Sequence, residues 1–209
     1  MGQATFWNLI AKRYSKSSIA DQQSYEKKLS ITRDYLEPDS EVLEFGCGTG
    51  STALLHAPNV KHILATDVAK NMISIAEEKR VQGGVENVTF EVNDLGGLLA
   101  RGGQYDVVLG LNILHLLDDL DAALAQVAAL VKDGGVFINS TACLQGKYKA
   151  LRSIGACFRL LGLFPTINAF TENELLEAHR RAGFVIETQW APEGGDVVFV
   201  VARKQAKAD

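Results

Sequence analysis

The chain has 209 residues, of which 47% are hydrophobic and 22% charged, values that predict one globular domain with a substantial core. The net charge of −4 gives no reason to expect a nucleic-acid partner, and no apolar run approaches the roughly 18 residues needed to span a membrane. No signal-peptide pattern opens the chain, and the cysteines Cys47, Cys143 and Cys157 are too scattered for a disulfide framework or a metal cluster. We therefore expect a reduced, cytoplasmic protein.

Two helices are expected before the first strand. Residues 4–16 carry apolar side chains at helical spacing, and Asp21 is suited to cap a second helix over 22–36, ahead of Pro38. Residues 1–36 hold six Lys or Arg against three Asp or Glu, so this addition to the core fold is basic.

The chain then alternates between strands and helices. Helices are expected at about 50–57 and 69–82, and from a cap at Asp118 or Asp119 to about 131. The expected strands, which are apolar or alternating and are bounded by Gly, Asn or Asp, are 41–45, 61–66 (closed by Asp67), 86–92, 105–111 and 136–142. This order of continuous apolar strands and crossover helices predicts a parallel sheet covered on both faces.

The last third departs from that alternation. Residues 144–163 are expected to form a helix with one apolar and one basic side. Thr171, with Glu174 three residues later, forms a capping box that begins another helix, and Gly183 ends it. Two strands joined by a short turn, 184–190 and 197–203, must then be antiparallel.

The stretch 41–50, EVLEFGCGTG, is the most informative part of the chain. A short strand ends in glycines at 46, 48 and 50, and a helix follows. Such a turn lets backbone N–H groups approach a ligand closely at the carboxyl end of a strand. The spacing is G-x-G-x-G, which differs from the G-x-G-x-x-G spacing of dinucleotide-binding turns.

This turn, the alternating strands and the terminal hairpin resemble the class I S-adenosylmethionine-dependent methyltransferases over about residues 40–203. The resemblance implies a three-layer, Rossmann-like α/β fold. Its sheet would have seven strands, mostly parallel, with an antiparallel C-terminal hairpin, N-terminal helices and a helical insertion after the fifth strand. The single domain, 1–209, would then comprise an N-terminal helical lid, a cofactor-binding half, a helical lid insertion, and a closing helix with the hairpin: 1–36, 40–142, 143–170 and 171–203.

The resemblance also assigns cofactor contacts to the glycine turn. S-adenosylmethionine is the implied cofactor, and S-adenosylhomocysteine the implied product. Backbone groups of Phe45, Gly46, Cys47 and Gly48 would contact its amino and carboxylate groups, and Glu44 would hold the turn from below.

Asp67, at the end of the second strand, is suited to accept hydrogen bonds from both ribose hydroxyls. An N-cap of the following helix is the alternative role. By resemblance, Val68 and Met72 would pack on the adenine face.

Polar residues also follow the third and fourth strands. By resemblance, Asn93, Asp94 and Leu95 would meet the adenine edge, although an ordinary Asn-Asp turn is the alternative. Leu111 and Asn112 would meet the amino end of the cofactor.

His115 follows this loop, close to where the transferred methyl group is expected. An imidazole there suits a general base, and positioning of the loop or of the substrate is the alternative. The other histidines are weaker candidates, and His179 is expected on a surface helix. Tyr14, with Trp7, would fold over the cofactor, unless it only packs an amphipathic helix.

Together these features predict methyl transfer to a small, partly apolar molecule, without a metal and without a nucleic-acid partner. One alternative is an NAD-type oxidoreductase, which the glycine spacing and the hairpin oppose. Another is a protein that binds S-adenosylmethionine without catalysis. The basic side of 144–163 indicates contact with a membrane surface or with an acidic or lipidic substrate. The alternative is a helix that lines the pocket and has a solvated outer face.

Overall fold

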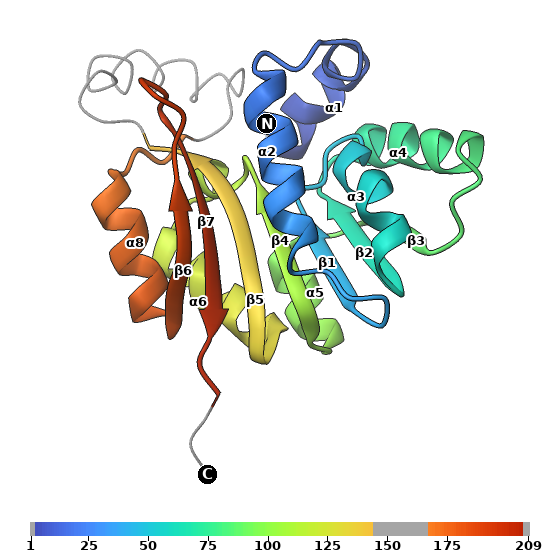
Figure 1. The fold of residues 1–209 in the computed structure, drawn as a ribbon. Helices are drawn as coiled ribbons and strands as arrows, with labels where there is room; N and C mark the ends of the chain where they lie inside the picture. Colours follow the sequence, from blue (N-terminus) through green and yellow to red (C-terminus); the bar gives the residue numbers. More distant parts are fainter. Residues whose placement is uncertain (1–2, 144–166, 207–209) are drawn as a thin grey trace.

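The computed structural model describes residues 3–143 and 167–206, and their core is one mixed sheet (Figure 1). Within these residues the sheet has seven strands in the order β3-β2-β1-β4-β5-β7-β6. The strands are β1 (Glu41–Phe45), β2 (His62–Asp67), β3 (Val88–Val92), β4 (Tyr105–Leu111), β5 (Val131–Ala142), β6 (Phe184–Trp190) and β7 (Val197–Lys204). Strands β1 to β5 pair in parallel, and β7 lies antiparallel between β5 and β6. The predicted seven-stranded sheet and its antiparallel C-terminal hairpin are confirmed.

Helices cover both faces of this sheet. On one face, α2 and α3 enclose a core that includes Val42, Ile63 and Phe199; on the other, α5, α6 and α8 enclose a core around Phe137 (Figure 1). The helices are α1 (Gln3–Tyr14), α2 (Gln22–Arg33), α3 (Ser51–His56), α4 (Lys70–Gln82), α5 (Leu95–Arg101), α6 (Leu120–Leu130) and α8 (Glu172–Arg181), with short 3₁₀ turns at Ala57–Asn59 and Leu114–Leu116. The chain is therefore a three-layer α/β domain.

Helix α5 is an element that the sequence pattern did not predict. Its first turn contains Gly96 and Gly97, which are poor helix formers, so the segment resembles a loop. Asp94 caps it by accepting from the backbone N–H of Gly97 at 2.8 Å, and Leu95 and Leu98 are buried against the sheet. Capping and tertiary packing therefore outweigh the low propensity.

Strand β5 also differs from its prediction, because it begins at residue 131 instead of 136. Val131 pairs with Tyr105, and the register then shifts before Val136 pairs with Val107. The Gly-Gly pair at 134–135 lies within this irregularity, so glycines that look like a boundary in the sequence are part of a bulged strand.

Two expectations about the C-terminal third have clear outcomes. The capping box at Thr171 and Glu174 is confirmed by its reciprocal hydrogen bonds. The surface location of His179 is wrong: its side chain is fully buried and stacks on Phe137. His179 lies four residues after the buried Leu175, so helical spacing places it on the buried face of α8, although arginines follow it in the sequence. The helix expected at 144–163 lies outside the described residues.

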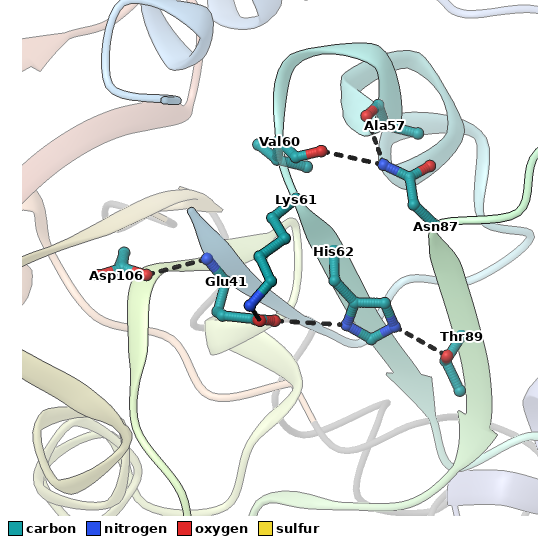
Figure 2. A network of polar contacts seen from close by, with 8 residues as sticks. All are labelled: Glu41, Ala57, Val60, Lys61, His62, Asn87, Thr89 and Asp106. Carbon is teal, nitrogen blue, oxygen red and sulfur yellow. Dashed lines mark hydrogen bonds and ion pairs between the residues drawn. The ribbon is translucent and has the colours of Figure 1, made fainter. Parts of the chain in front are cut away.

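A polar network joins the strand starts at the edge opposite the carboxyl ends of the parallel strands (Figure 2). The backbone N–H of Glu41 donates to Asp106 at 2.9 Å, and the Glu41 carboxylate pairs with Lys61 at 2.8 Å. His62 lies between Glu41 and Thr89 in this network. These contacts tie together the starts of β1, β2, β3 and β4, and they place His62 away from the ligand-facing edge.

Candidate functional site

The carboxyl ends of four parallel strands bring together the polar residues that the sequence analysis singled out. The glycine turn follows β1, Asp67 ends β2, Asp94 follows β3, and Leu111 ends β4 next to Asn112. Helix α1 lies over this edge of the sheet (Figure 1). Ligands of open α/β sheets bind at this edge.

Two of the three glycines in the turn, Gly48 and Gly50, have different structural roles. Both have left-handed backbone angles, with φ of 54° at Gly48 and 72° at Gly50. A β-carbon on Gly50 would lie 2.5 Å from the Phe90 ring and 2.7 Å from Ala76, so packing alone requires glycine there. A β-carbon on Gly48 would meet only the Tyr14 ring at 3.8 Å. Gly48 therefore leaves an open approach to its backbone, as a bound ligand requires.

The Asp67 carboxylate holds this turn in place. One oxygen accepts from the backbone N–H of Gly48 at 3.0 Å and the other from that of Ala69 at 2.8 Å. Burial raises the pKa of Asp67 and outweighs the two N–H donors, which lower it. The N-cap position of α4 is Ala69, so Asp67 links the turn to the start of α4 instead of capping it. Each oxygen keeps a lone pair for a ligand hydroxyl.

Glu44 is the residue before Phe45 at the end of β1, next to the turn, and its support of the turn stays a prediction. Glu44 is buried, and it accepts from the backbone N–H of Ala53 in the first turn of α3. Because Gly50 has no side chain with which to cap α3, Glu44 satisfies this donor from β1. Burial raises the pKa of Glu44 to about 8, and its Oε2 atom has no hydrogen-bond partner among the described residues.

Two cavities adjoin the turn. The smaller, of about 120 Å³, is lined by every residue predicted to bind the cofactor except Glu44 and Cys47. These two line the larger cavity, of about 390 Å³. The cavities share Tyr14, Gly46, Gly48, Leu111 and Asn112. The structure thus gathers the predicted cofactor residues around one continuous region.

At the far side of the smaller cavity, Asp94 has one carboxylate oxygen engaged as the cap of α5. Val68 and Met72 line the wall between Asp67 and α1, and Trp7 contributes from α1 itself. Sequence reasoning missed three apolar lining residues that follow β4: Ile113, Leu116 and Leu117. The apolar residues that follow Asn112 in the sequence are the signal that could have identified this part of the lining.

The loop after β4 is constrained. Asn112 has a positive φ of 56°, which is uncommon for a residue with a side chain. Its backbone N–H donates to the carbonyl of Ser140 at 2.7 Å, and the Ser140 hydroxyl donates to its side-chain oxygen at 3.3 Å. This anchoring to β5 holds Asn112 at the junction of the two cavities.

His115 does not line either cavity as the described residues define them. Its backbone N–H donates to the Thr141 hydroxyl oxygen, and its ring Nδ1 lies 3.1 Å from the same atom. Burial lowers the pKa of His115, so the ring is neutral near pH 7. This geometry accords with positioning of the loop, and the general-base role stays a prediction.

Neither a metal centre nor a membrane helix emerges from the described residues. No group of three or more His, Cys, Asp or Glu side chains in residues 3–143 and 167–206 has the arrangement that a metal ion needs. None of the helices in those ranges is long and apolar enough to cross a membrane. Cys47 and Cys143 are free thiols.

Comparison with known proteins shows similarity to methyltransferases. Residues 43–137 match the family model described as "Methyltransferase domain". An uncharacterised methyltransferase of Bacillus subtilis, YcgJ, is 30% identical over 100 residues, which are 48% of this chain and 40% of that protein. The demethylmenaquinone methyltransferase of Leptospira interrogans is 34% identical over 148 residues, which are 64% of this chain and 57% of that protein. The chain thus spans about half the length of these curated relatives.

A solved structure extends the likeness to nearly the whole fold. The magnesium protoporphyrin IX methyltransferase of Synechocystis PCC 6803, with bound S-adenosylhomocysteine, superposes with a TM-score of 0.72 at 20% identity. The match covers 97% of this chain and 98% of that one. The family model matches residues 43–137, and the strand order and this superposition show that the chain has the fold of such methyltransferases.

Proposed function

We propose that this protein transfers a methyl group from S-adenosylmethionine to a small, partly apolar molecule. The observation that carries the proposal is the single region at the carboxyl ends of β1 to β4, where the glycine turn, Asp67 and Asp94 surround the smaller cavity. The named activity of the Leptospira interrogans relative, on demethylmenaquinone, supports a small-molecule acceptor.

The residues present fit this cofactor. Asp67 has lone pairs for the ribose hydroxyls, and Asp94 has a second carboxylate oxygen for an amino group of the base. Gly48 leaves backbone open to the methionine end, and the unpartnered Oε2 of Glu44 is a buried polar atom that needs a hydrogen-bond partner. A bound polar group would supply that partner.

When bound, the cofactor supplies a methyl group on a sulfonium sulfur, which an acceptor atom displaces in line. This chain's own contribution is then alignment and exclusion of water, and alignment alone can lower a barrier by up to about 7–11 kcal/mol. Trp7 and Tyr14 on α1 close one side, and Ile113, Leu116 and Leu117 form an apolar wall. A side-chain base is required only if the acceptor atom must lose a proton, and His115 is our candidate for that role.

Three further expectations belong to the proposal. The basic N-terminal segment and residues 143–170 would enclose the acceptor as two lids. The cytoplasm is the proposed location, in agreement with the free thiols of Cys47 and Cys143. The third expectation is contact with a membrane surface through residues 144–163, a segment that lies outside the described residues.

Calorimetry on the full chain tests the cofactor assignment. We expect S-adenosylhomocysteine to bind at micromolar concentration and NAD not to bind. Tight binding of NAD without binding of S-adenosylhomocysteine would reject the proposal in favour of an oxidoreductase.

A methyl-transfer screen with radiolabelled S-adenosylmethionine tests turnover. We expect label in the small-molecule fraction of a cell extract, and a strongly reduced yield with Asp67→Asn. Binding of S-adenosylhomocysteine without label transfer to any fraction would favour the alternative of a non-catalytic S-adenosylmethionine-binding protein. That alternative is tested because His115 is not among the residues that line either cavity.

A further inference from the structure

The larger cavity has a charged character that the cofactor residues do not explain. Lys28 of α2 and Lys79 of α4 line it from opposite helices. Neither ammonium forms an ion pair with a carboxylate among the described residues. Other basic side chains do form such pairs, among them those of Lys61, Arg80, Arg101 and Lys132. Burial is the largest cause that lowers the pKa of both lysines.

The two lysines differ in what they contact. Lys79 donates to the Thr49 carbonyl at 3.1 Å, to the Thr49 hydroxyl at 2.9 Å and to the Ser51 hydroxyl at 2.9 Å. All three of its donors are therefore occupied, and it supplies positive charge while holding the end of the glycine turn. The Lys28 ammonium has no hydrogen-bond partner among the described residues, so its three donors are free for a ligand.

The remaining lining is rich in neutral donors. Hydroxyl groups come from the α1–α2 connection, from α2 and from the start of α3, and they belong to Ser18, Tyr25, Thr32, Ser51 and Thr52. The hydroxyls of Ser15 and Ser17 also line the cavity, but they already donate to the carbonyls of Lys12 and Tyr14. Leu111 and Asn112 connect the same space to the smaller cavity.

Two carboxyl groups lie near these cations: Asp21 attracts Lys28 without forming an ion pair with it, and Glu44 lines the cavity with a pKa raised to about 8. A cavity lined by hydroxyl groups and two ammonium groups without an ion pair among the described residues is complementary to an anion, since charge-assisted hydrogen bonds are about twice as strong as neutral ones.

We propose that Lys28, supported by the charge of Lys79, binds a carboxylate or phosphate group in the larger cavity. Partial burial disfavours an unpaired ammonium, and a bound anion offsets this cost. The inference deepens the proposed function, because it gives this end of the site an anionic ligand beside the partly apolar wall. The carboxylate of the methionine end of the cofactor and an anionic group on the methyl acceptor are the two sources of this chemistry.

A matched pair of variants tests the proposal. Lys28→Gln removes the proposed ligand, and Lys27→Gln removes the same charge one residue earlier on α2, where the ammonium lies 4.1 Å from the centre of the Trp190 ring. Lys28→Arg is the conservative variant. Thermal unfolding of each full-length variant checks that the fold is retained.

Calorimetry with S-adenosylhomocysteine and 5′-methylthioadenosine, which lacks the amino-acid end, identifies the source. If the cofactor provides the carboxylate, Lys28→Gln weakens binding of S-adenosylhomocysteine by about tenfold or more and leaves 5′-methylthioadenosine unaffected. Lys27→Gln stays within about twofold of wild type for both ligands, and Lys28→Arg recovers most of the lost affinity.

If the acceptor provides the anion, both nucleosides bind Lys28→Gln normally. Inorganic phosphate then binds the wild-type protein loaded with S-adenosylhomocysteine at millimolar concentration, more weakly as salt rises, and does not bind Lys28→Gln. Unchanged nucleoside binding together with no phosphate binding to wild type overturns the proposal.

Failure of the proposed function gives a different result. In that case neither nucleoside binds the wild-type chain. Phosphate titrated into the ligand-free protein then still decides whether Lys28 forms an anion site.

Discussion

At the scale of single residues, Gly48 and Gly50 separate ligand access from packing. Both adopt left-handed backbone angles, but only Gly50 is pressed against neighbouring side chains, the Phe90 ring and Ala76. Their shared motif hides this difference, because the letter spacing carries no information about what surrounds each residue.

Alanine at each glycine should therefore have a distinct effect. Gly48→Ala adds only backbone strain, which should lower the free energy of unfolding by about 1–2 kcal/mol. It should also weaken binding of S-adenosylhomocysteine by about tenfold or more. Gly50→Ala adds overpacking, and should lower the free energy of unfolding by about 1–3 kcal/mol more than Gly48→Ala. Denaturant unfolding and calorimetry measure the two effects; equal losses of stability would contradict the packing argument.

The buried carboxyl of Glu44 should make the stability of the protein depend on pH. Its pKa is raised to about 8 in the folded protein, so the folded state holds the proton more tightly than the unfolded state does. Its contribution to stability is therefore full below the unfolded value near 4.5 and is lost as pH rises through about 8. The loss is at most about 5 kcal/mol, because one pKa unit corresponds to about 1.4 kcal/mol.

Glu44→Gln should abolish this fall, since an amide oxygen still accepts from Ala53 but does not ionise. The free energy of unfolding from pH 5 to pH 9 should then decline less in the variant than in wild type. Parallel profiles would show that Glu44 is ionised in the folded protein throughout.

At the scale of elements, the docking of α1 on α4 connects the N-terminal segment with the site. The side-chain oxygen of Asn8 accepts from the backbone N–H of Asn71 at 2.8 Å, and the Asn71 amide donates to the Asn8 carbonyl at 3.0 Å. The N-cap residue of α4, Ala69, has no side chain able to cap, so Asn8 satisfies this helix end from α1.

Asn8→Ala should loosen α1 and cost about 1 kcal/mol of stability, as expected for a lost cap. Because Trp7 and Tyr14 line the cavities from the same helix, the affinity for S-adenosylhomocysteine should fall several-fold. Leu9→Ala is the matched control, since Leu9 is 73% exposed on α1 and should alter neither quantity. A stability loss with unchanged affinity would show that α1 does not contribute to binding.

At the scale of the whole molecule, both helical layers contain a buried histidine. His56, at the end of α3, has no hydrogen-bond partner for either ring nitrogen among the described residues. His179, in α8, donates from Nδ1 to the Leu175 carbonyl and accepts at Nε2 from the Asn139 amide. Burial lowers the pKa of each to about 4, so both are neutral in the folded protein.

Acid should therefore destabilise the molecule. The unfolded chain binds these protons near pH 6.5 and the folded chain only near pH 4, so stability is full above pH 6.5 and is lost as pH falls to about 4. Each histidine accounts for up to about 3 kcal/mol. Glu44 acts in the opposite sense over an overlapping range, so variants are needed to separate the contributions.

His56→Leu should leave the free energy of unfolding at pH 7.5 nearly unchanged, because it removes an unpartnered ring. It should also reduce the loss between pH 6.5 and pH 4. Denaturant unfolding at pH 7.5, 5.5 and 4 measures this; a slope equal to that of wild type would show that His56 is not the buried titrating group.

Features that depend on a few neighbouring residues could be predicted from the amino-acid pattern. The glycine turn, the capping box at Thr171, the crossover pattern and the terminal hairpin were all predictable, because turn residues, caps and hydrophobic periodicity act locally. The residues lining the smaller cavity were largely predictable too, because carboxyl ends of parallel strands meet at one edge of the sheet.

Other features arise from the packing of distant segments and could not be predicted in this way. Helix α5 forms despite its glycines because the sheet buries its leucines, and His179 is buried because its helix packs on Phe137. Lys28 and Lys79 lie far apart in the sequence and line one cavity only after α2 and α4 have packed beside the turn. Burial, pKa and cavity lining depend on contacts between distant segments, and a local sequence pattern does not contain them.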